Sequence, residues 1–411
     1  MEQFDYLVVG GGVAGTTAAE TIRGRDPAAA IAIVSDEPHP LYSRVLLPNY
    51  VKGLASRDQV FLRRPEDYRA AHIAFFGGET AEGLDAAGQA LRLSSGRELG
   101  FGKLLIAAGG RPRPLGIPGE ELPGVSRFQT IEDADRMRER LTDARRAVVV
   151  GGSFIALEYL DILAGLRIPT TLVIPQAYLF SRFLEPAAGE LLRENFRRHG
   201  IALATRDRLC AVEGDGAVRG ARLETGGRLE CDFVGVGIGL ERNTAWLGSA
   251  LTLTPSGIAT DEFLQTSCPG IFAAGDVADF QDITLGVRHT HGNWGNAFRQ
   301  GELAGRNMAH PASPEPYRSV TSYGIRNLGF HVAFVGHVLE GPGIDTVSRF
   351  DAANQVYERF FLRQERMVGA VVINRPEDRA AITTLIRDAV PLSAARERFT
   401  DAAFDIATLI P

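Results

Sequence analysis

The sequence is poor in cysteine, and its few cysteines follow no pairing pattern. The 411 residues include three, Cys210, Cys231 and Cys268, and none is spaced as C-x-x-C. This arrangement indicates no disulfide framework, no cysteine-based metal site and no dithiol centre. Because disulfide bonds persist mainly in oxidising compartments, a reducing cytoplasm is the simplest expected location.

Long apolar runs, a basic leader and an excess of positive charge are also missing. No run approaches the roughly 20 apolar residues that span a bilayer, and the N-terminal sequence MEQFDYLVVGGG lacks the layout of a secretory signal. Asp and Glu (50) outnumber Lys and Arg (44), which gives a net charge of −6. Nucleic-acid-binding proteins usually carry a basic face. We therefore expect neither membrane insertion nor a nucleic-acid partner.

Histidine offers no metal pattern either. The eight histidines form no H-E-x-x-H motif and no paired Cys/His spacing, so we expect no bound metal. His289 and His291 are expected to be ordinary loop residues or hydrogen-bond donors. What remains is an ordinary globular composition, with 45% hydrophobic and 23% charged residues, in a chain long enough for two or three domains.

The first pattern with chemical meaning lies near the N-terminus. An apolar run at 6–9, typical of a buried parallel strand, enters GGGVAG at 10–15, and a helical pattern follows at 16–23. Strand, G-x-G-x-x-G and helix in this order predict a dinucleotide-binding turn.

Each position of that turn has a physical role. Gly10 permits the tight turn, Gly12 lets a pyrophosphate approach the backbone, and Gly15 lets helix and strand pack closely. The N-terminus of the helix that follows presents free N–H groups and the positive end of its dipole to the phosphates.

An acid is expected about 20 residues further on, where it would bind a ribose hydroxyl. The next apolar run, 31–34, leads into Ser35, Asp36 and Glu37. The sequence does not choose between Asp36 and Glu37.

A weaker copy of the motif follows the apolar run 147–150, where the sequence reads GGSFIALE at 151–158. Two glycines of the pattern are replaced, by Ser153 and Ala156. The next strand, 171–174, runs into Pro175 and Gln176, with neither a carboxylate nor an arginine pair, although Arg182 is near. A second dinucleotide site is expected, NADH and NADPH both remain open, and weakened or lost binding is the alternative.

Further segments make the pattern resemble the pyridine nucleotide–disulfide oxidoreductase superfamily. Within it, residues 3–311 are most similar to rubredoxin and ferredoxin reductases and to the flavin part of NAD(P)H-nitrite reductases. The segments that carry the resemblance are LLIAAGGRP (104–112), TSCPGIFAAGDVA (266–278), DEPHPLYSRVLLP (36–48) and HGNWGNA (291–297), continuing through QG (300–301) and GRNM (305–308).

The resemblance implies an α/β fold with two Rossmann-type domains, as in glutathione reductase, and a C-terminal α+β interface domain. The FAD-binding domain would comprise 1–115 and 245–311, with the NAD(P)-binding domain, 116–244, inserted between them. The interface domain, 312–411, would contain strands near 332–335, 357–362 and 368–373 and a helix near 378–389. A homodimer through this domain is a further expectation.

The resemblance also assigns residues. Asp276 would hydrogen-bond the FAD ribityl chain, Arg44 would lie at the FAD, and Trp294 would approach the flavin ring. Glu158 and Trp294 are the expected catalytic residues. The full expected cofactor-binding set is Gly10, Gly12, Val13, Ala14, Gly15, Asp36, Glu37, Arg44, Ala81, Ala108, Gly109, Arg111, Gly151, Ser153, Phe154, Ile155, Glu158, Gly275, Asp276 and Trp294.

Two positions depart from the family pattern. Asn49 stands where the family often has a lysine paired with the glutamate at 158, so we expect that pair to be absent. Gly324, beside Tyr323, stands where an aromatic residue often covers the flavin.

The same resemblance suggests where the electrons go. Related disulfide reductases and oxidases carry a reactive cysteine that segment 44–48, RVLLP, lacks. We therefore expect NAD(P)H to reduce FAD, and FAD to reduce an external acceptor directly. The favoured acceptor is a small electron-transfer protein, rubredoxin or ferredoxin. The alternatives are a small molecule such as a quinone, a metal ion or oxygen, and a redox sensor with slow turnover. Arg193, Arg197 and Arg198 would be a solvated helix face or a docking patch for an acidic carrier.

Overall fold

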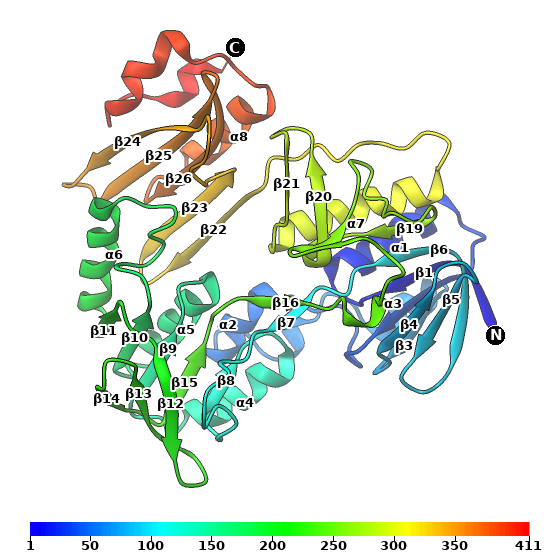
Figure 1. Cartoon of the computed structure of the whole chain (residues 1–411), viewed down its shortest axis with the longest axis horizontal. Coiled ribbons are helices and arrows are strands. Elements are labelled where there is room, and N and C mark those ends of the chain that lie inside the picture. The colour runs from blue at the N-terminus through cyan, green and yellow to red at the C-terminus, as the bar shows by residue number, and fades with distance from the viewer. Residues whose placement is uncertain (411) are drawn as a thin grey trace. The chain divides into compact units, whose positions relative to one another are not determined.

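A computed structural model describes residues 1–410 (Figure 1). The chain divides into two compact units. Unit 1 comprises Met1–Val45, Arg57–Arg111 and Glu241–Thr321, and unit 2 comprises Leu46–Ser56, Pro112–Leu240 and Ser322–Pro411.

Unit 1 is built around a seven-stranded sheet with the order β3-β2-β1-β6-β5-β4 and β19 paired to β6. Strands β3, β2, β1, β6 and β19 are parallel, whereas β4 and β5 form an antiparallel extension. The strands of this sheet are β1 (Glu2–Val9), β2 (Ile31–Ser35), β3 (Ile73–Gly77), β4 (Ala81–Asp85), β5 (Ala90–Leu93), β6 (Glu98–Ile106) and β19 (Ile271–Ala273).

Two helices pack together against this sheet, α1 (Val13–Arg25) and α7 (Trp294–Ala309) (Figure 1). They can approach closely because Gly301 has no side chain: a Cβ there would lie only 2.2 Å from the Ala14 carbonyl oxygen. Successive residues of β1 alternate between two cores, with Val8 in the core under these helices and Leu7 in the core on the other face. The buried end of β1, residues 6–9, is therefore continuously apolar, as expected for a parallel strand covered on both faces.

Smaller elements complete unit 1. Strands β17, β18, β20 and β21 form a four-stranded sheet, and β7 and β16, each of which has one residue in the sequence range of unit 2, pair with each other. The bounds are η2 (Asp58–Val60), α3 (Pro65–Ala70), β7 (Gly110–Pro112), β16 (Leu240–Arg242), η3 (Ala245–Leu247), β17 (Leu253–Thr254), β18 (Gly257–Ala259), η4 (Gly275–Val277), β20 (Ala278–Asp282) and β21 (Val287–His289). The 3₁₀ turn η1 (Arg44–Leu46) spans the boundary between the units.

Unit 2 contains a five-stranded parallel sheet with the order β11-β10-β9-β15-β8 and a three-stranded antiparallel sheet, β12-β13-β14. The elements of this part are α2 (Leu47–Val51), β8 (Val125–Arg127), α4 (Ile131–Leu141), β9 (Ala147–Val150), α5 (Phe154–Gly165), β10 (Thr170–Ile174), α6 (Pro186–Arg198), β11 (Ile201–Thr205), β12 (Leu209–Gly214), β13 (Val218–Leu223), β14 (Arg228–Glu230) and β15 (Phe233–Val236).

A separate antiparallel sheet, β22-β23-β26-β25-β24, lies in the C-terminal part of unit 2. Its strands and the elements that follow are β22 (Ser322–Asn327), β23 (Phe330–Gly336), β24 (Asp345–Asp351), β25 (Val356–Arg363), β26 (Arg366–Ile373), α8 (Asp378–Arg387), η5 (Ser393–Thr400) and η6 (Ile406–Leu409). The three strands and the helix predicted here from the sequence are confirmed.

A buried ion pair links this sheet to the chain that follows it. Arg349 is almost fully buried and pairs with Glu358 and Asp378, while its Nη1 donates to the Phe404 carbonyl oxygen at 2.6 Å. The predicted α/β class is confirmed. The three-domain division stays a prediction, supported by the separate sheets that residues 125–236 and 322–373 form within unit 2.

Candidate functional site

The first glycine turn has the shape that a pyrophosphate requires. Gly10 has φ +115°, and a Cβ there would lie 2.2 Å from the Ala107 carbonyl oxygen. A Cβ on Gly15 would lie 1.9 Å from the Gly10 carbonyl oxygen, whereas one on Gly12 would meet nothing within 4 Å. Gly10 and Gly15 are therefore required by the protein's own packing, and Gly12 leaves a space open.

The beginning of α1 faces that open space. Gly12 is the N-cap of α1, and no side chain caps the helix, so the first N–H groups, including those of Val13 and Ala14, lack the usual side-chain acceptor. Uncapped N–H groups at the positive end of a helix dipole bind phosphate. The residues present therefore fit the phosphates of a dinucleotide.

Glu37 and Asp36, which the sequence could not separate, have different surroundings. Glu37 is half-buried, and its carboxylate accepts hydrogen bonds from Tyr42 Oη and from Arg44 Nη2, the latter at 2.6 Å. Asp36 is exposed, and its Oδ1 accepts from the Glu37 N–H. Burial lowers the pKa of Arg44, but Glu37 and other anionic groups outweigh it and raise that pKa overall. Glu37 is the acid that its neighbours hold in place, and the assignment of either acid to a ribose stays a prediction.

The distant Gly275–Asp276 segment lies beside the first turn. A Cβ on Gly275 would lie 3.2 Å from the Ala14 Cβ, and the Gly275 N–H donates to Gln300 Oε1 at 2.8 Å. Burial raises the pKa of Asp276, while Arg242 and Arg44 lower it. Two segments more than 250 residues apart in the sequence thus place a carboxylate and an open helix end in one region of unit 1.

Trp294 begins α7 close to Asp276. Its ring packs against the core under α1, and the Asn293 side chain caps the helix by accepting from the Asn296 N–H at 2.9 Å. A Cβ on Gly292 would lie 3.4 Å from Asp276 Oδ2. The start of α7 therefore belongs to the same region as Asp276, while one of its N–H groups is already used by Asn293.

Four other predicted residues of unit 1 have distinct environments. Ala108 and Gly109 follow β6 at the end where Ala107 meets Gly10, and no atom lies within 4 Å of a Cβ on Gly109. Ala81 is buried in the core on the far face of the sheet. Arg111 is 75% exposed and pairs with Glu241 at 3.2 Å. Ala108 and Gly109 thus adjoin the turn, whereas the roles of Ala81 and Arg111 rest on the resemblance alone.

The second glycine turn, in unit 2, keeps its shape despite its changed sequence. Gly151 has φ +111°, and a Cβ there would lie 2.2 Å from the Gly237 carbonyl oxygen. The Ser153 hydroxyl donates to that oxygen at 2.7 Å and caps α5 by accepting from the Ala156 N–H at 3.3 Å. The serine thus serves as a helix cap and does not deform the turn.

The next two predicted residues, Phe154 and Ile155, form the first turn of α5. The Phe154 ring packs edge-on against Tyr323 and Phe334, with centroids at 4.6 and 5.1 Å. Ile155 is half-buried. The side chain of Phe154 is therefore held in an aromatic cluster, and only its backbone remains as a candidate phosphate contact.

Glu158 lies one turn further along α5 in a charged cluster that the sequence did not reveal. Burial raises its pKa to about 7; Asp161 also raises it, and Lys52 lowers it. Lys52 Nζ lies 2.7 Å from Asp161 Oδ2, and Asp161 Oδ1 accepts from the Leu328 N–H at 2.8 Å.

Asn49 stands in place of the family's lysine, but Lys52, three residues later, brings a cation to this cluster. It pairs with Asp161, the carboxylate three residues after Glu158. The i, i+3 spacing of Glu158 and Asp161 was the sequence signal that these two acids lie side by side on one helix.

One unexpected cluster joins a carboxylate and two imidazoles in unit 1. Asp282 Oδ2 lies 3.0 Å from His289 Nε2, and ligand-type atoms of Asp282, His289 and His291 all lie within 4.8 Å of one another. Asp282 Oδ1 also accepts from the N–H groups of Thr284 and Leu285. These hydrogen bonds tighten the β20–β21 hairpin, and the expectation of no bound metal stays a prediction.

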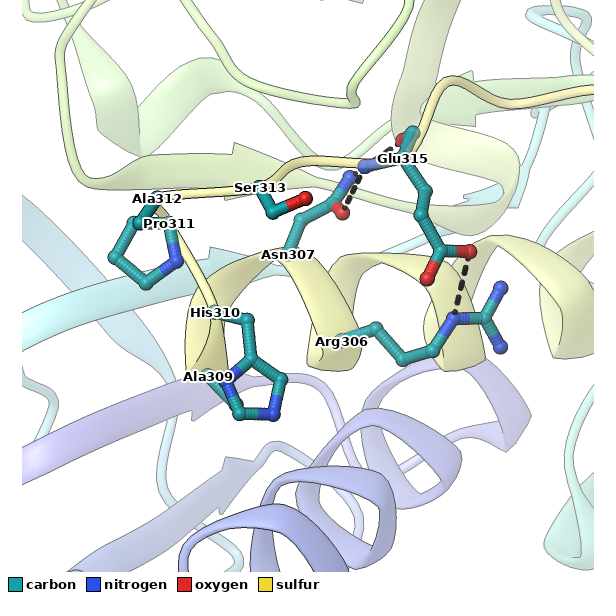
Figure 2. Close-up of a pocket in the computed structure, with 8 residues that line it drawn as sticks. All are labelled: Arg306, Asn307, Ala309, His310, Pro311, Ala312, Ser313 and Glu315. Carbon is teal, nitrogen blue, oxygen red and sulfur yellow. Dashed lines mark hydrogen bonds and ion pairs between the residues drawn. The ribbon is translucent and has the colours of Figure 1, made fainter.

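A surface hollow of about 450 Å³ lies elsewhere, at the C-terminal end of α7 (Figure 2). It is lined by Arg306 and Asn307 from the helix and by residues of the following linker, and Glu315 pairs with Arg306 across it at 3.3 Å. Its lining includes none of the predicted cofactor-binding residues.

Together, two strand–turn–helix units with positive-φ glycines define the class: a dinucleotide-binding oxidoreductase of the doubly wound α/β type. The sequence family "Pyridine nucleotide-disulphide oxidoreductase" matches residues 4–301, and the chain belongs to this family. It is therefore an FAD-dependent NAD(P)H oxidoreductase, as the sequence predicted.

The relatives include proteins of similar length and proteins that are much longer. The ferredoxin reductase subunit of 5,5'-dehydrodivanillate O-demethylase from Sphingobium sp. (strain NBRC 103272 / SYK-6) is 30% identical over 98% of this chain and 97% of its own. Nitrite reductase [NAD(P)H] from Bacillus subtilis (strain 168) is 26% identical over 96% of this chain, which spans only 48% of that protein.

Solved structures agree with this relationship. The covalent putidaredoxin reductase–putidaredoxin complex matches with a TM-score of 0.91 and 27% identity, over 100% of this chain and 98% of that one. Among the described residues, no helix has the length and apolar character to cross a membrane.

Proposed function

We propose that this protein passes electrons from NAD(P)H, through FAD, to a small electron-transfer protein of the ferredoxin or rubredoxin type. The observation that carries the proposal is the convergence of the first glycine turn with Gly275 and Asp276, in a chain whose segment 44–48 has no cysteine. Relatives of similar length are named as ferredoxin reductases, and one solved relative is joined to putidaredoxin.

The cysteines support transfer without a dithiol step. Cys210, Cys231 and Cys268 are all free, and burial raises the pKa of Cys231 to about 12. A thiol with so high a pKa is a poor nucleophile at neutral pH, because the thiolate is the reactive form. Free cysteines also suit the proposed cytoplasmic location.

FAD, when bound, accepts the two electrons of a hydride and releases them one at a time. The protein's part is to bind and orient. In unit 1, Gly12 and the first N–H groups of α1 would hold the phosphates, Asp276 would bind the sugar-alcohol chain, and Arg44 would neutralise negative charge. In unit 2, the turn at Gly151 would hold the nicotinamide nucleotide. Glu158, with a pKa of about 7, would hold or release a proton near neutral pH.

The sensor alternative and the α6 docking patch both lose support in the structure. A slow-turnover sensor was suggested by the changed second motif, but Ser153 fits the turn as a helix cap. The arginines of α6 pair with glutamates of the same helix, Arg193 with Glu190 and both Arg197 and Arg198 with Glu194, which supports a solvated face there. A small-molecule acceptor remains the alternative to test.

The test begins with anaerobic stopped-flow reduction of the FAD-loaded protein by NADH and by NADPH. Reduction should complete within about a second, because turnover numbers of ordinary enzymes are on the order of 10 per second. Ferredoxin, rubredoxin, a quinone and oxygen are then compared as acceptors. A ferredoxin or rubredoxin should give a kcat/KM at least tenfold above the quinone. Faster turnover with quinone would contradict the proposed acceptor, and reduction over minutes would favour a sensor.

The C-terminal sheet is the proposed dimer surface. Phe350 lies on the edge strand β24 and is 43% exposed, which is unusual for a large apolar side chain on a sheet edge. Light scattering of the purified protein should give twice the chain mass, and a monomer at micromolar concentration would contradict this part of the proposal.

A further inference from the structure

The parallel sheet of unit 2 brings two residues together at its carboxyl edge. Strands β10 and β11 pair in register, with Ile174 opposite Thr205 at their last residues. Just beyond, the Arg206 N–H donates to the Gln176 carbonyl oxygen at 3.0 Å. Ligands of doubly wound folds bind outside the carboxyl ends of the strands, so Gln176 and Arg206 lie where an adenosine ribose is expected.

Gln176 reaches the second glycine turn with its side chain. Its Oε1 lies 3.7 Å from the position that a Cβ on Gly152 would occupy. In NAD-specific sites an acid near this place hydrogen-bonds the ribose 2′-hydroxyl. Gln176 is neutral, so it would not repel a phosphate on that hydroxyl as a carboxylate would.

Arg206 presents an unpaired positive charge beside Gln176. Its backbone is left-handed, with φ +54°, and its side chain is exposed. The acid next in sequence, Asp207, is turned inward, where it accepts from Thr225 Oγ1 at 2.6 Å and from the Arg208 N–H at 2.8 Å. Within residues 1–410 the Arg206 guanidinium forms no ion pair or hydrogen bond, in contrast to the arginines of α6.

The loop after Gln176 adds a second cation. Arg182 is exposed and follows Gln176 by six residues, within the segment that leads from β10 to α6. No carboxylate stands between Ile174 and Arg182 in the sequence. Arg182 and Arg206 therefore present two exposed positive charges at this edge, while Asp207 is buried.

We propose that the nicotinamide site prefers NADPH to NADH, with Arg206 pairing with the 2′-phosphate and Gln176 as the neutral residue that admits it. This inference rests on the proposed function, in which the second glycine turn holds the nicotinamide nucleotide. A guanidinium matches phosphate geometry with two parallel N–H donors, and such charge-assisted hydrogen bonds are roughly twice as strong as neutral ones.

The test uses binding of the oxidised coenzymes, which undergo no reaction. FAD-loaded protein is titrated calorimetrically with NADP⁺ and NAD⁺, and with the fragments 2′,5′-ADP and 5′-AMP. We expect NADP⁺ to bind at least tenfold more tightly than NAD⁺, and 2′,5′-ADP to bind more tightly than 5′-AMP. The Arg206→Ala variant should weaken NADP⁺ binding at least tenfold, which is about 1.4 kcal/mol, because it removes a charge-assisted hydrogen bond to the phosphate, and should change NAD⁺ binding less than threefold. The Gln176→Glu variant should also weaken the binding of NADP⁺ more than the binding of NAD⁺.

Arg167→Ala is the matched control. Arg167 is likewise exposed and left-handed, with φ +58°, but it follows α5 and precedes β10, at the opposite edge of the sheet. This variant should bind both coenzymes as the unaltered protein does.

The outcomes separate this inference from the proposed function. Tighter binding of NAD⁺ than of NADP⁺, or an equal loss of both in Arg206→Ala, would overturn the NADPH preference and leave the reductase function standing. If neither coenzyme binds and neither reduced form bleaches the flavin, the proposed function fails, and the preference fails with it.

Discussion

The two glycine turns reach the same shape with small residues in different places. In the first turn, Gly15 is essential, because a Cβ there would lie 1.9 Å from the Gly10 carbonyl oxygen. The second turn has Ala156 at that position, and a glycine appears instead at Gly237, where a Cβ would lie 2.7 Å from the Ala156 nitrogen.

Gly237 and Ala107 occupy matching places in the two turns. Each carbonyl oxygen would lie 2.2 Å from a Cβ on the first glycine of its own motif, Gly151 or Gly10. The space that the first turn gains within its motif, the second gains from the neighbouring strand. A motif that looks degenerate in sequence can therefore keep its three-dimensional shape. The helix caps also differ, because Gly12 offers no side chain to α1 whereas the Ser153 side chain caps α5.

The largest expected effect comes from breaking the first turn. Gly10→Ala adds a Cβ against backbone at a φ that alanine avoids, so the protein should fold without FAD or fail to fold. The measurement is the FAD-to-protein absorbance ratio after purification. Gly12→Ala is the companion variant: its Cβ meets no protein atom, so the fold should survive while FAD affinity falls at least tenfold. Normal FAD content in both variants would contradict the assignment of this turn.

Gly237→Ala tests the compensation in the second turn. Its Cβ would collide with backbone of α5, and overpacking of this kind costs about 1–3 kcal/mol. The expected results are a lower melting temperature and weaker nicotinamide binding, with FAD retained because Gly237 belongs to unit 2. An unchanged melting temperature would show that Gly237 is not the residue that makes room.

Two substitutions of Ser153 distinguish its role as a helix cap from its place in the turn. Ser153→Ala removes the cap and should lower the free energy of unfolding by about 1 kcal/mol, whereas Ser153→Gly should lower it by only a few tenths. Chemical denaturation followed by far-UV circular dichroism measures the difference. If Ser153→Gly were the more damaging change, the serine would have a role other than capping.

Glu158 should give the smallest effect, and one that depends on pH. Its pKa of about 7 in the folded protein lies above its ordinary value of 4.5. The folded state therefore binds the proton more tightly, and this contribution to stability is full below about pH 4.5 and lost as pH rises through about 7.

The Glu158→Gln variant should lose that contribution to the pH dependence, both in melting temperature and in the rate of flavin reduction. Comparison with the unaltered protein matters, because burial also raises the pKa of Glu358 to about 7. Identical pH profiles in the two proteins would contradict the role given to Glu158.

Local pattern was enough to predict the strand–turn–helix at residues 6–23 and the C-terminal strands near 332–335, 357–362 and 368–373. Each depends on periodicity or on turn chemistry within a few residues. Lys52 and Asp161 could not be paired in this way, because 109 residues separate them and only the fold joins them.

The sequence could not predict the directions of side chains either. The sequence placed two acids, Asp36 and Glu37, at the end of one strand, but the choice between them depends on Tyr42 and Arg44, which follow an irregular segment. Gly237 was missed for the same reason as Lys52: its importance depends on a neighbour 81 residues away, Ala156.

The most direct measurement is the visible spectrum of protein refolded with excess FAD and then desalted, followed by anaerobic titration with NADPH and NADH. We expect a yellow protein with one tightly bound FAD per chain, which about one equivalent of reduced nicotinamide coenzyme bleaches. A colourless protein that retains no FAD would contradict it, because Gly10, Gly12, Gly275 and Asp276 would then meet in space without holding the cofactor.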